Sequence, residues 1–503
     1  MWLLNLLSRH GRLRFSRYRH IISTLIRYGF GEIVYQTGTA KLIRVLRRIS
    51  FRRKPEETVH IERYSTWQRA RMAVEELGPT FIKLGQILSN RPDLIPRELQ
   101  DELEKLQENV APFSADQAIG VIEEDLGVPI GELFDSFDRE PVAAASIAQI
   151  HRAVLKEGPE VAVKVERPGL KDLVEVDVSI LRELAGLLVR YVPESTKVGP
   201  EELVDEFERG MMQELDFRRE AAAIERFASQ FEGEAGVKIP NVYRKYSTRR
   251  VLTMEFVTGT PLSSFMEEET GDREEASRIA EVGAEFTLKQ VFTHGFFHAD
   301  PHPGNIFILE DGRLCYLDFG LTGKLIQRDL ENMSGLLISI IEQDEQKASR
   351  AVVRLSGGRN YDAARRIERD IDELIDRFRS TQAGDFSFTA LLSELVEILV
   401  DNDLRLSPDL YLLVKTLITI EGVATGLDPG FDFAAHIEPF VKHLVKERYD
   451  PGRVARKLAA SAEDYGEVIR SLPGDYYRLV DTLSSGRIRV SLVIWWSSCG
   501  RVT

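Results

Sequence analysis

Three polar side chains on two short segments have the types and spacing needed to handle a phosphoryl group. Asp300 and Asn305 lie five residues apart in the segment Phe297–Asn305, and Asp318 follows thirteen residues later in an Asp-Phe-Gly sequence. Phosphoryl transfer needs a carboxylate that orients the attacking hydroxyl and oxygen ligands that hold Mg²⁺. We assign the first task to Asp300 and metal binding to Asn305 and Asp318, since such oxygen ligands suit a hard cation.

A lysine far upstream completes this set. Lys164 alternates with valines in the predicted strand 161–165, where an ammonium can reach nucleotide phosphates and pair with a helix carboxylate. Taken alone, it would be a solvent-facing strand lysine. We expect one helical stretch over 199–230 to supply the carboxylate, with Glu214 and Glu220 as candidates. Six residues apart, they point in different directions on an ideal helix, and we favour Glu214 as the partner of Lys164.

An alanine-rich turn precedes this strand, at the place where a glycine-rich phosphate loop would be expected. It consists of Ala143, Ala144, Ala145 and Ser146. Glycines let a loop bend over phosphates, whereas alanines restrict φ. We expect a stiffer loop that contacts the nucleotide differently; the alternative is an alanine-rich turn of no functional consequence.

A helix near the N-terminus carries a polar stripe between apolar flanks. In the predicted helix Pro79–Ser89, Lys83 and Gln86 share one face. This pattern indicates a helix covered on both sides, with both side chains reaching into a site. An ordinary amphipathic helix with a solvated polar face fits the pattern equally well.

The histidines around Asp300 allow a competing interpretation. His298, Asp300 and His302 have spacing that would suit a metal-binding hydrolase. Such a site would leave Asn305, Asp318 and Lys164 without roles. We therefore expect His298 to pack and form hydrogen bonds within the catalytic loop.

The elements that must position these residues form an α+β, two-lobed, protein-kinase-like plan with a helical N-terminal extension and a helical C-terminal tail. Short β-rich runs around a Gly-Pro turn predict a hairpin, and the chain is mainly helical after about residue 270. The expected parts are a basic helical arm at 1–58, a helical extension at 59–125, an N-lobe at 126–258, a C-lobe at 259–430 and a tail at 431–503.

Charge is distributed unevenly along the 503 residues. The net charge of −14 argues against nucleic acid as a partner. Residues 1–54 nevertheless carry about +12, which leaves −26 on the rest. This arm could lie on an anionic membrane or pack as helices on the acidic body. The two cysteines, Cys315 and Cys499, predict a reducing compartment and no disulfide framework.

Together these motifs resemble the UbiB family of atypical protein-kinase-like proteins, over roughly residues 60–425. The matching segments are K-x-G-Q at Lys83–Gln86, the alanine-rich turn, V-A-V-K at Val161–Lys164, E-x-D-F-x-x-E-A at Glu214–Ala221, H-x-D-x-H-P-G-N at His298–Asn305, and Asp318–Gly320. The resemblance implies that ATP or ADP binds with Mg²⁺, and that adenine is received at the hinge Glu255–Val257, hence at Glu255 and Val257. It also implies an extension that packs over the active site and places Lys83 and Gln86 where a protein substrate would bind.

The same resemblance implies an ATPase or small-molecule kinase that supports ubiquinone or other isoprenoid-lipid biosynthesis. Its partners would be a membrane lipid or isoprenoid-quinone precursor and possible quinone-biosynthesis enzymes; the oligomeric state stays open. Many bacterial members end in two transmembrane helices, which we do not recognise here, so we expect a cytoplasmic protein, peripheral at the membrane. The alternatives are an aminoglycoside-kinase-like phosphotransferase for small hydroxyl compounds and a nucleotide-gated scaffold of little catalytic activity.

Overall fold

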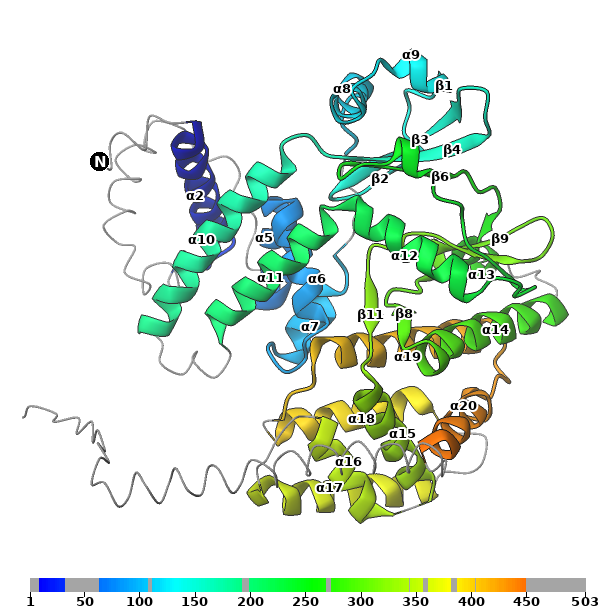
Figure 1. Cartoon of the computed structure of the whole chain (residues 1–503). Coiled ribbons are helices and arrows are strands. Elements are labelled where there is room, and N and C mark those ends of the chain that lie inside the picture. The colour runs from blue at the N-terminus through cyan, green and yellow to red at the C-terminus, as the bar shows by residue number, and fades with distance from the viewer. Residues whose placement is uncertain are drawn as a thin grey trace, which may run out of the picture. The chain divides into compact units, whose positions relative to one another are not determined.

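The computed structural model describes residues 9–31, 63–106, 111–191, 199–267, 273–342, 344–355, 361–380, 387–402 and 404–448. The chain divides into a compact unit over Met1–Val441 and a second unit over Lys442–Thr503. Only 442–448 of the second unit are described, so the architecture below is that of the first unit (Figure 1).

An antiparallel sheet forms the N-lobe. Its strands follow the order β1 (Phe134–Phe137), β3 (Ala148–Leu155), β4 (Glu160–Glu166) and β6 (Val251–Glu255), and β2 (Ala143–Ala144) pairs with β3. Helix α8 (Ala115–Leu126) begins with a capping box at Ser114, and the short helix α9 (Ile130–Leu133) leads into β1. The expected hairpin around Gly158-Pro159 is therefore the β3–β4 pair.

The two faces of this sheet pack against different helices, and that decides where Lys164 points. Val161, Val163 and Val165 pack with α8 in one apolar cluster, while Ala162 packs in another with the helices that follow the sheet. Because side chains alternate along a strand, Lys164 faces the same side as Ala162. We assigned α8 to the extension from sequence, but its apolar side chains pack in the core of this sheet.

The stretch expected to be one helix over 199–230 is two helices. After the long helix α10 (Leu170–Tyr191), α11 spans Pro200–Glu214 and α12 spans Phe217–Gln230. Asp216 caps α12, its side chain accepting a hydrogen bond from the Arg218 N–H. A capping aspartate satisfies amides that an uninterrupted helix would have bonded internally, so it favours a new helix start. The single-helix expectation was wrong for this reason.

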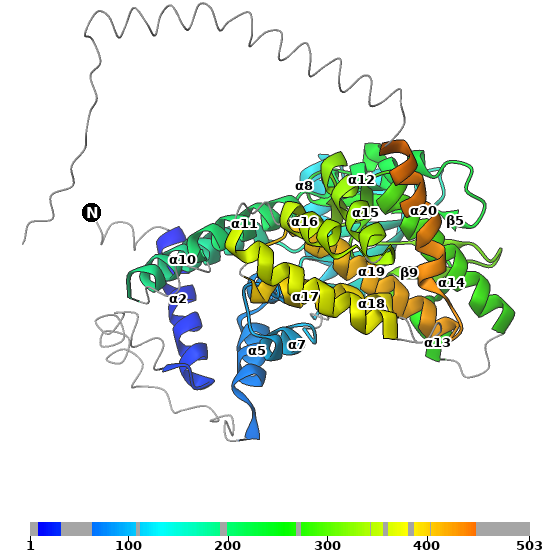
Figure 2. The same ribbon diagram turned by 90° about the horizontal axis from the view of Figure 1, so that it is seen from below.

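The N-terminal extension packs beside α10 and α11 (Figures 1 and 2). Its helices are α2 (Arg9–Arg27), α5 (Thr66–Leu77), α6 (Pro79–Ser89) and α7 (Arg97–Leu103). Gly78, with φ of +88°, makes the sharp turn between α5 and α6, and Pro79 occupies the first position of α6 as expected.

Within the described residues, the basic arm packs on the acidic body. Arg17 binds the buried Asp177 through Nε and Oδ1 at 2.6 Å and also donates to the carbonyl of Leu77. The side chains of Ile21 and Ile22 are buried. Of the two interpretations of the basic arm, packing on the acidic body rather than on a membrane therefore describes helix α2. The apolar start Trp2–Leu4 and residues 32–54 lie outside the described residues.

Short strands bring the segment of Asp300 and Asn305 together with the segment of Asp318. The order in one sheet is β5 (Val237–Lys238), β10 (Leu314–Tyr316), β9 (Ile306–Ile308) and β7 (Thr260–Pro261), and β11 (Thr322–Lys324) pairs with β8 (Phe296–His298). The backbone N–H of Leu317 donates a hydrogen bond to the Asn305 carbonyl at 2.8 Å, which joins the segment of Asp318 to the segment of Asn305.

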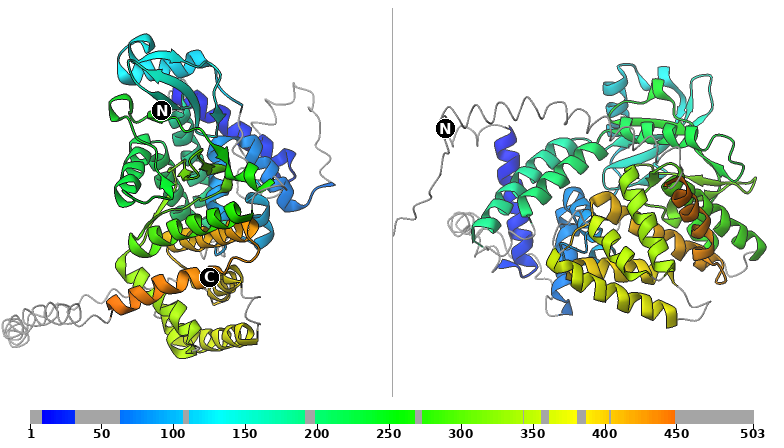
Figure 3. Two further views of the ribbon diagram at one scale, coloured as in Figure 1. Left: turned by 90° about the vertical axis from the view of Figure 1, so that its right-hand side faces the viewer. Right: turned by 60° about the horizontal axis from the view of Figure 1, so that its bottom comes forward.

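The C-lobe is helical, as expected (Figures 1 and 3). Its helices are α13 (Leu262–Glu267), α14 (Arg273–Leu288) with a π-helical end at Lys289–Thr293, α15 (Gln327–Ile341), α16 (Glu345–Leu355), α17 (Tyr361–Ser380), α18 (Phe388–Asp401), α19 (Pro408–Leu427) and α20 (Phe433–Arg448). Phe433 and Ile437 of α20 are buried, so the expected tail begins with a helix that packs into this lobe.

Helix α19 is long and apolar enough to cross a membrane, a feature that the sequence analysis did not recognise. It is the one such helix among the described residues, and 56% of its most apolar window is buried. Leu413 and Leu417 are fully buried and α19 packs on α14. A core helix of a globular lobe meets the same length and composition criteria, so this is weak support for a membrane span.

Candidate active site

Lys164 and its partner Glu220 are the most enclosed charged groups of the site. The Nζ of Lys164 lies 2.9 and 3.0 Å from the two carboxylate oxygens of Glu220 and 3.4 Å from Oδ1 of Asp318. The ammonium also lies 5.6 Å from the centre of the Phe217 ring. Burial disfavours the charged ammonium, but the charges of Asp318 and Glu220 outweigh it and raise the pKa of Lys164. The site therefore holds a positive charge at neutral pH, beside the carboxylate of Asp318.

The carboxylate that pairs with Lys164 is Glu220, and our choice of Glu214 was wrong. The break at Asp216 starts a new helix, so the angle between the two glutamates cannot be taken from one ideal helix. Glu220 lies in the first turn of α12 and is buried under the face of the sheet to which Lys164 points. Glu214 ends α11 and forms an ion pair with Lys83 instead.

Lys83 enters the site from the extension. Helix α6 is covered on both sides: Phe81 and Ile82 pack in two separate apolar clusters. The charge of Lys83 helps to lower the pKa of Asp318. Of the two interpretations of this helix, the covered helix describes the fold, and Lys83 pairs with Glu214. Gln86, one turn later, is half-buried.

Close packing explains why the third position of the K-x-G-Q motif is a glycine. A Cβ on Gly85 would lie 2.5 Å from Cδ1 of Leu106 and 3.3 Å from Cδ2 of Leu103. A contact under 3.0 Å forces a neighbour to move. A larger residue at this position would therefore require the Leu106 side chain to move.

His298 organises the catalytic segment rather than a metal. Its Nδ1 accepts a hydrogen bond from the Asp300 N–H at 3.2 Å, and its Nε2 lies 3.3 Å from the Leu317 carbonyl. An imidazole that accepts at Nδ1 and donates at Nε2 is neutral, in keeping with burial, which lowers its pKa. In the described residues, no group of three His, Cys, Asp or Glu side chains is placed to hold a metal. The His298–Asp300–His302 metal site is therefore not formed.

A buried glutamine that sequence reasoning missed supports this histidine. Gln290, in the π-helical end of α14, accepts a hydrogen bond from the backbone N–H of His298 at 2.8 Å. Nothing in the sequence separates Gln290 from other helical glutamines, because only the fold brings it to the start of the catalytic segment.

Asp318 has the properties of a cation ligand. It is one of two non-glycine residues with positive φ, at 54°, among those described. Its Oδ1 accepts the Gly320 N–H at 3.1 Å, and its side chain remains 48% exposed. The ammonium of Lys164 is the main cause that lowers the pKa of Asp318 to about 2, so the carboxylate is ionised. An ionised, accessible carboxylate tied by one backbone bond to the segment of Asn305 fits the oxygen donors that Mg²⁺ prefers.

The alanine-rich turn is a tight end of the β2–β3 hairpin. Ala143 pairs with Ile150, Ala144 with Gln149, and the Ala145 N–H donates to the Ala148 carbonyl at 2.8 Å. None of these turn residues has positive φ, so alanine is tolerated without backbone strain. The Ser146 hydroxyl is buried and makes no hydrogen bond. A buried hydroxyl without a partner is a candidate contact for a bound ligand or an ordered water.

At the hinge, the Glu255 side chain is already engaged. It accepts hydrogen bonds from the Asn241 side chain at 3.0 Å and the Asn241 backbone at 3.2 Å, and forms an ion pair with Lys238. The Glu255 N–H also donates to the Asn241 carbonyl at 2.8 Å, so any adenine contact at Glu255 would use its backbone carbonyl. Cys315, on the strand beside Lys238, is a buried core thiol whose pKa burial raises to about 12.

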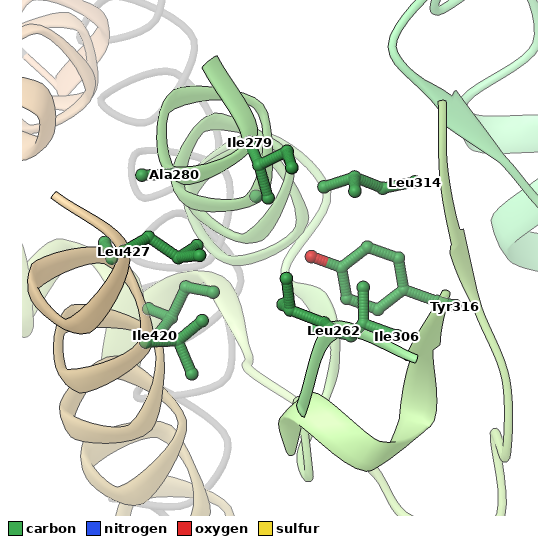
Figure 4. Close-up of a pocket in the computed structure, with 11 residues that line it drawn as sticks. Leu262, Ile279, Ala280, Ile306, Leu314, Tyr316, Ile420 and Leu427 are labelled. Atoms are coloured by element: carbon green, nitrogen blue, oxygen red, sulfur yellow. The ribbon is translucent and has the colours of Figure 1, made fainter. Parts of the chain in front are cut away.

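A small apolar pocket lies deeper in the C-lobe, between α14 and α19 (Figure 4). Its lining includes Ile279, Leu314, Ile420 and the Tyr316 ring. It contains none of the charged site residues, so we regard it as a packing defect separate from the candidate active site.

Comparison with known proteins identifies the family. Residues 105–352 match the ABC1 atypical kinase-like domain, and residues 371–432 match the UbiB helical domain. The chain is 34% identical over 456 residues to a protein of Pseudomonas putida named "Probable protein kinase UbiB", covering 90% of this chain and 84% of that one. It is 36% identical over 436 residues to the uncharacterized protein sll1770 of Synechocystis, covering 85% and 73%.

A solved structure, that of Mycobacterium tuberculosis Rv3197 with erythromycin, is 24% identical and covers 69% of this chain and 91% of that one. Its TM-score of 0.42 is too low to assign a fold. The family-model matches and the curated relatives confirm the predicted family and the kinase-like plan with a helical C-terminal region. The chain belongs to the UbiB family of atypical kinase-like proteins.

Proposed function

We propose that this protein binds ATP or ADP with Mg²⁺ and uses the site for phosphoryl transfer or ATP hydrolysis. The observation that carries the proposal is the position of Lys164, buried between Glu220 and Asp318. A buried ammonium held by a helix carboxylate, beside an ionised aspartate of Asp-Phe-Gly, is the arrangement that kinases use to hold nucleotide phosphates and their metal.

In this proposal each residue has one role. Lys164 contacts the phosphates, with Glu220 rather than Glu214 as the helix partner. Asp300 orients the acceptor hydroxyl or water. Asn305 and Asp318 supply oxygen ligands to Mg²⁺, which would neutralise charge on the phosphates. The turn Ala143–Ser146 covers the phosphates, and the backbone of Glu255 and Val257 receives the adenine.

The extension bears on the choice of acceptor. Lys83 and Gln86 stand on a helix that is packed into the fold, and Lys83 is paired with Glu214 beside the site. Both would occupy space that a peptide acceptor needs. We therefore propose water or a small hydroxyl compound as the acceptor. Relatives named as probable UbiB protein kinases support a role in ubiquinone or other isoprenoid-lipid biosynthesis, with a lipid precursor or biosynthetic enzymes as partners.

A thermal-unfolding experiment tests the nucleotide site. Purified protein is heated with ATP, ADP and Mg²⁺, singly and together, beside the variants Asp318→Asn and Asp311→Asn. Asp311 is a matched control, because it is an exposed aspartate paired with Arg313. Binding at 100 times the dissociation constant adds about 2.7 kcal/mol. We expect a Mg²⁺-dependent shift that Asp318→Asn loses and Asp311→Asn keeps; no shift in a folded wild-type protein would refute the proposal.

A nucleotide-gated scaffold is the second candidate, favoured by the presence of Lys83 near Asp318. A cation in that position competes with a metal for the same carboxylate. The two functions differ in turnover. ADP release that exceeds the Asp318→Asn control establishes an enzyme, whereas nucleotide binding with turnover equal to that control establishes the scaffold.

We propose a cytoplasmic protein that contacts membranes peripherally through the basic residues 1–54. Their charge of about +12 supports attraction to anionic lipid, although part of α2 packs on the body. Co-sedimentation of the full chain with vesicles rich in anionic lipid should be strong, and should fall with salt and with neutral vesicles. Equal binding to both kinds of vesicle would contradict an electrostatic contact.

A further inference from the structure

Arg167 lies three residues after Lys164 and joins two segments that are distant in sequence. Its Nε donates to the Ala145 carbonyl at 3.0 Å, and its Nη2 donates to the Ala111 carbonyl at 2.9 Å. The guanidinium also lies 5.5 Å from the centre of the Phe113 ring. One side chain thus contacts the alanine-rich turn and the segment 111–113.

The backbone fixes Arg167 beside the turn. The Arg167 N–H donates to the Ile147 carbonyl at 2.9 Å, so its main chain and side chain contact the residues on the two sides of Ser146. A guanidinium presents several donors in a rigid planar fork, which lets it bridge two carbonyls at once. A lysine ammonium is a compact charge on a flexible stem and does not reproduce that geometry.

The segment 111–113 has a second anchor on the sheet. The Phe113 N–H donates to Oε1 of Gln149 at 3.0 Å, and Nε2 of Gln149 lies 2.7 Å from Nε2 of His151. Gln149 and His151 are fully buried on β3, the strand that also pairs with the turn. The segment leads directly to Ser114, which caps α8, and follows the extension that ends with α7 and Leu106.

We propose that Arg167 is a positioning residue that latches the alanine-rich turn to the linker between the extension and the N-lobe. The turn then moves only when the linker contact at Phe113 loosens. Nucleotide affinity at the turn would consequently depend on a contact that the nucleotide does not touch. This last consequence rests on the proposed nucleotide function; the latch itself does not.

The latch is tested first without nucleotide. Hydrogen exchange of a peptide covering residues 142–148 is compared in wild type, Arg167→Ala, Arg167→Lys, Phe113→Leu and Arg244→Ala. Arg244 is the matched control, an exposed N-lobe arginine paired with Glu225. Hydrogen bonds from a charged donor contribute about 1.5–3 kcal/mol, which corresponds to an increase in exchange of about 10-fold or more in Arg167→Ala. Residues 142–148 should exchange nearly as fast in Arg167→Lys as in Arg167→Ala, and in the control Arg244→Ala they should exchange as slowly as in wild type.

Phe113→Leu keeps the proposal falsifiable if the arginine variants are unstable, because it leaves Arg167 and the turn unchanged in sequence. We expect faster exchange at residues 142–148 in this variant, and no further increase in the double variant with Arg167→Ala. Unchanged exchange of the turn in both Phe113→Leu and Arg167→Ala, or full rescue by Arg167→Lys, would overturn the latch.

Nucleotide affinity tests the coupling. We expect ADP and ATP dissociation constants to change at least 3-fold in Phe113→Leu and in Arg167→Ala, in the same direction and without adding in the double variant, as contacts on one path behave. Additive changes, or unchanged affinities, would refute the coupling. If the wild type binds no nucleotide, the proposed function fails, while the exchange experiment still decides whether the latch exists.

Discussion

Two lysine–glutamate pairs meet at the candidate site, and they differ in origin and enclosure. Lys164 of β4 pairs with Glu220 of α12, with 8% and 6% of their side chains exposed. Lys83 of the extension pairs with Glu214 of α11, with 15% and 18% exposed. The first pair lies within the N-lobe, whereas the second joins the extension to it. We therefore expect the enclosed pair to determine stability and phosphate binding. We expect the more accessible pair to affect how much Mg²⁺ the site needs.

Removing the carboxylate of the enclosed pair should have the largest effect. Breaking a buried ion pair by removing one partner costs about 3–5 kcal/mol, and the 3.4 Å contact with Asp318 compensates the remaining charge of Lys164 only in part. We expect Glu220→Gln to lower the free energy of unfolding by roughly that amount, as measured by urea unfolding at pH 7. A loss no greater than that of Glu214→Gln would contradict the contrast between the pairs.

A third glutamate shows what burial does without a close lysine. Glu166, at the end of β4, is buried; its nearest cation is Arg249 at 3.5 Å, and one carboxylate oxygen has no hydrogen-bond partner. Burial raises the pKa of Glu166 to about 7. The folded state then holds the proton more tightly than the unfolded state, so stability falls as pH rises from about 4.5 to 7.

Replacing this glutamate should therefore stabilise the protein in the alkaline range. At 1.36 kcal/mol per pKa unit, Glu166→Gln should gain no more than about 3 kcal/mol at pH 8 and little at pH 4. Thermal unfolding of both proteins from pH 4 to 8 measures this difference. A gain that is equal at all pH values would show that Glu166 does not titrate in this range.

Breaking the accessible pair should cost less and act on the metal. We expect Glu214→Gln to reduce stability by about 1–3 kcal/mol, less than Glu220→Gln, because both side chains of this pair keep some contact with water. Lys83, freed from Glu214, would be drawn toward Asp318 and would raise the Mg²⁺ concentration needed for nucleotide binding. A Mg²⁺ titration of the nucleotide-dependent thermal shift measures this Mg²⁺ requirement. Lys83→Met removes the competing cation, so it should lower the Mg²⁺ concentration needed. An unchanged Mg²⁺ requirement in both variants would contradict the competition.

The smallest effect concerns Asp318, which both lysines influence. Its pKa is lowered to about 2 from 3.8, so the stability it provides is complete above about 3.8 and is lost as pH falls toward 2. Because the side chain is about half exposed, the effect is modest. The stability gap between wild type and Asp318→Asn, measured by urea unfolding between pH 3 and 6, should shrink below about pH 4. A stability gap that widens below about pH 4 would contradict the predicted direction of the pH dependence.

The sequence predicted the parts of the site that lie on local motifs. Asp300 and Asn305 share one short segment, and Asp318 opens another, so their chemical types and spacing could be read directly. The bond between Leu317 and Asn305 shows that the two segments are joined in the fold. The β-rich lobe, the helical lobe and the paired strands around Gly158 followed from apolar alternation and turn residues.

Long-range pairings were predicted less well. Of two glutamates six residues apart we favoured Glu214 as the partner of Lys164, whereas the partner is Glu220. The deciding signal, Asp216 as a helix cap, was present in the sequence but was read as part of a continuous helix. Gln290 and Arg167 had no local signal, because their partners lie elsewhere in the chain.

By itself, the sequence determined the chemistry that this protein can offer: an ammonium, carboxylates and an amide with the spacing of a phosphoryl-transfer site, in the order of a kinase-like chain. Only the tertiary structure decided which charge neutralises which. Ion pairing depends on the face to which a strand side chain points and on where a helix restarts, and both are set by packing against distant elements. That is why Lys164 pairs with Glu220 and Lys83 with Glu214.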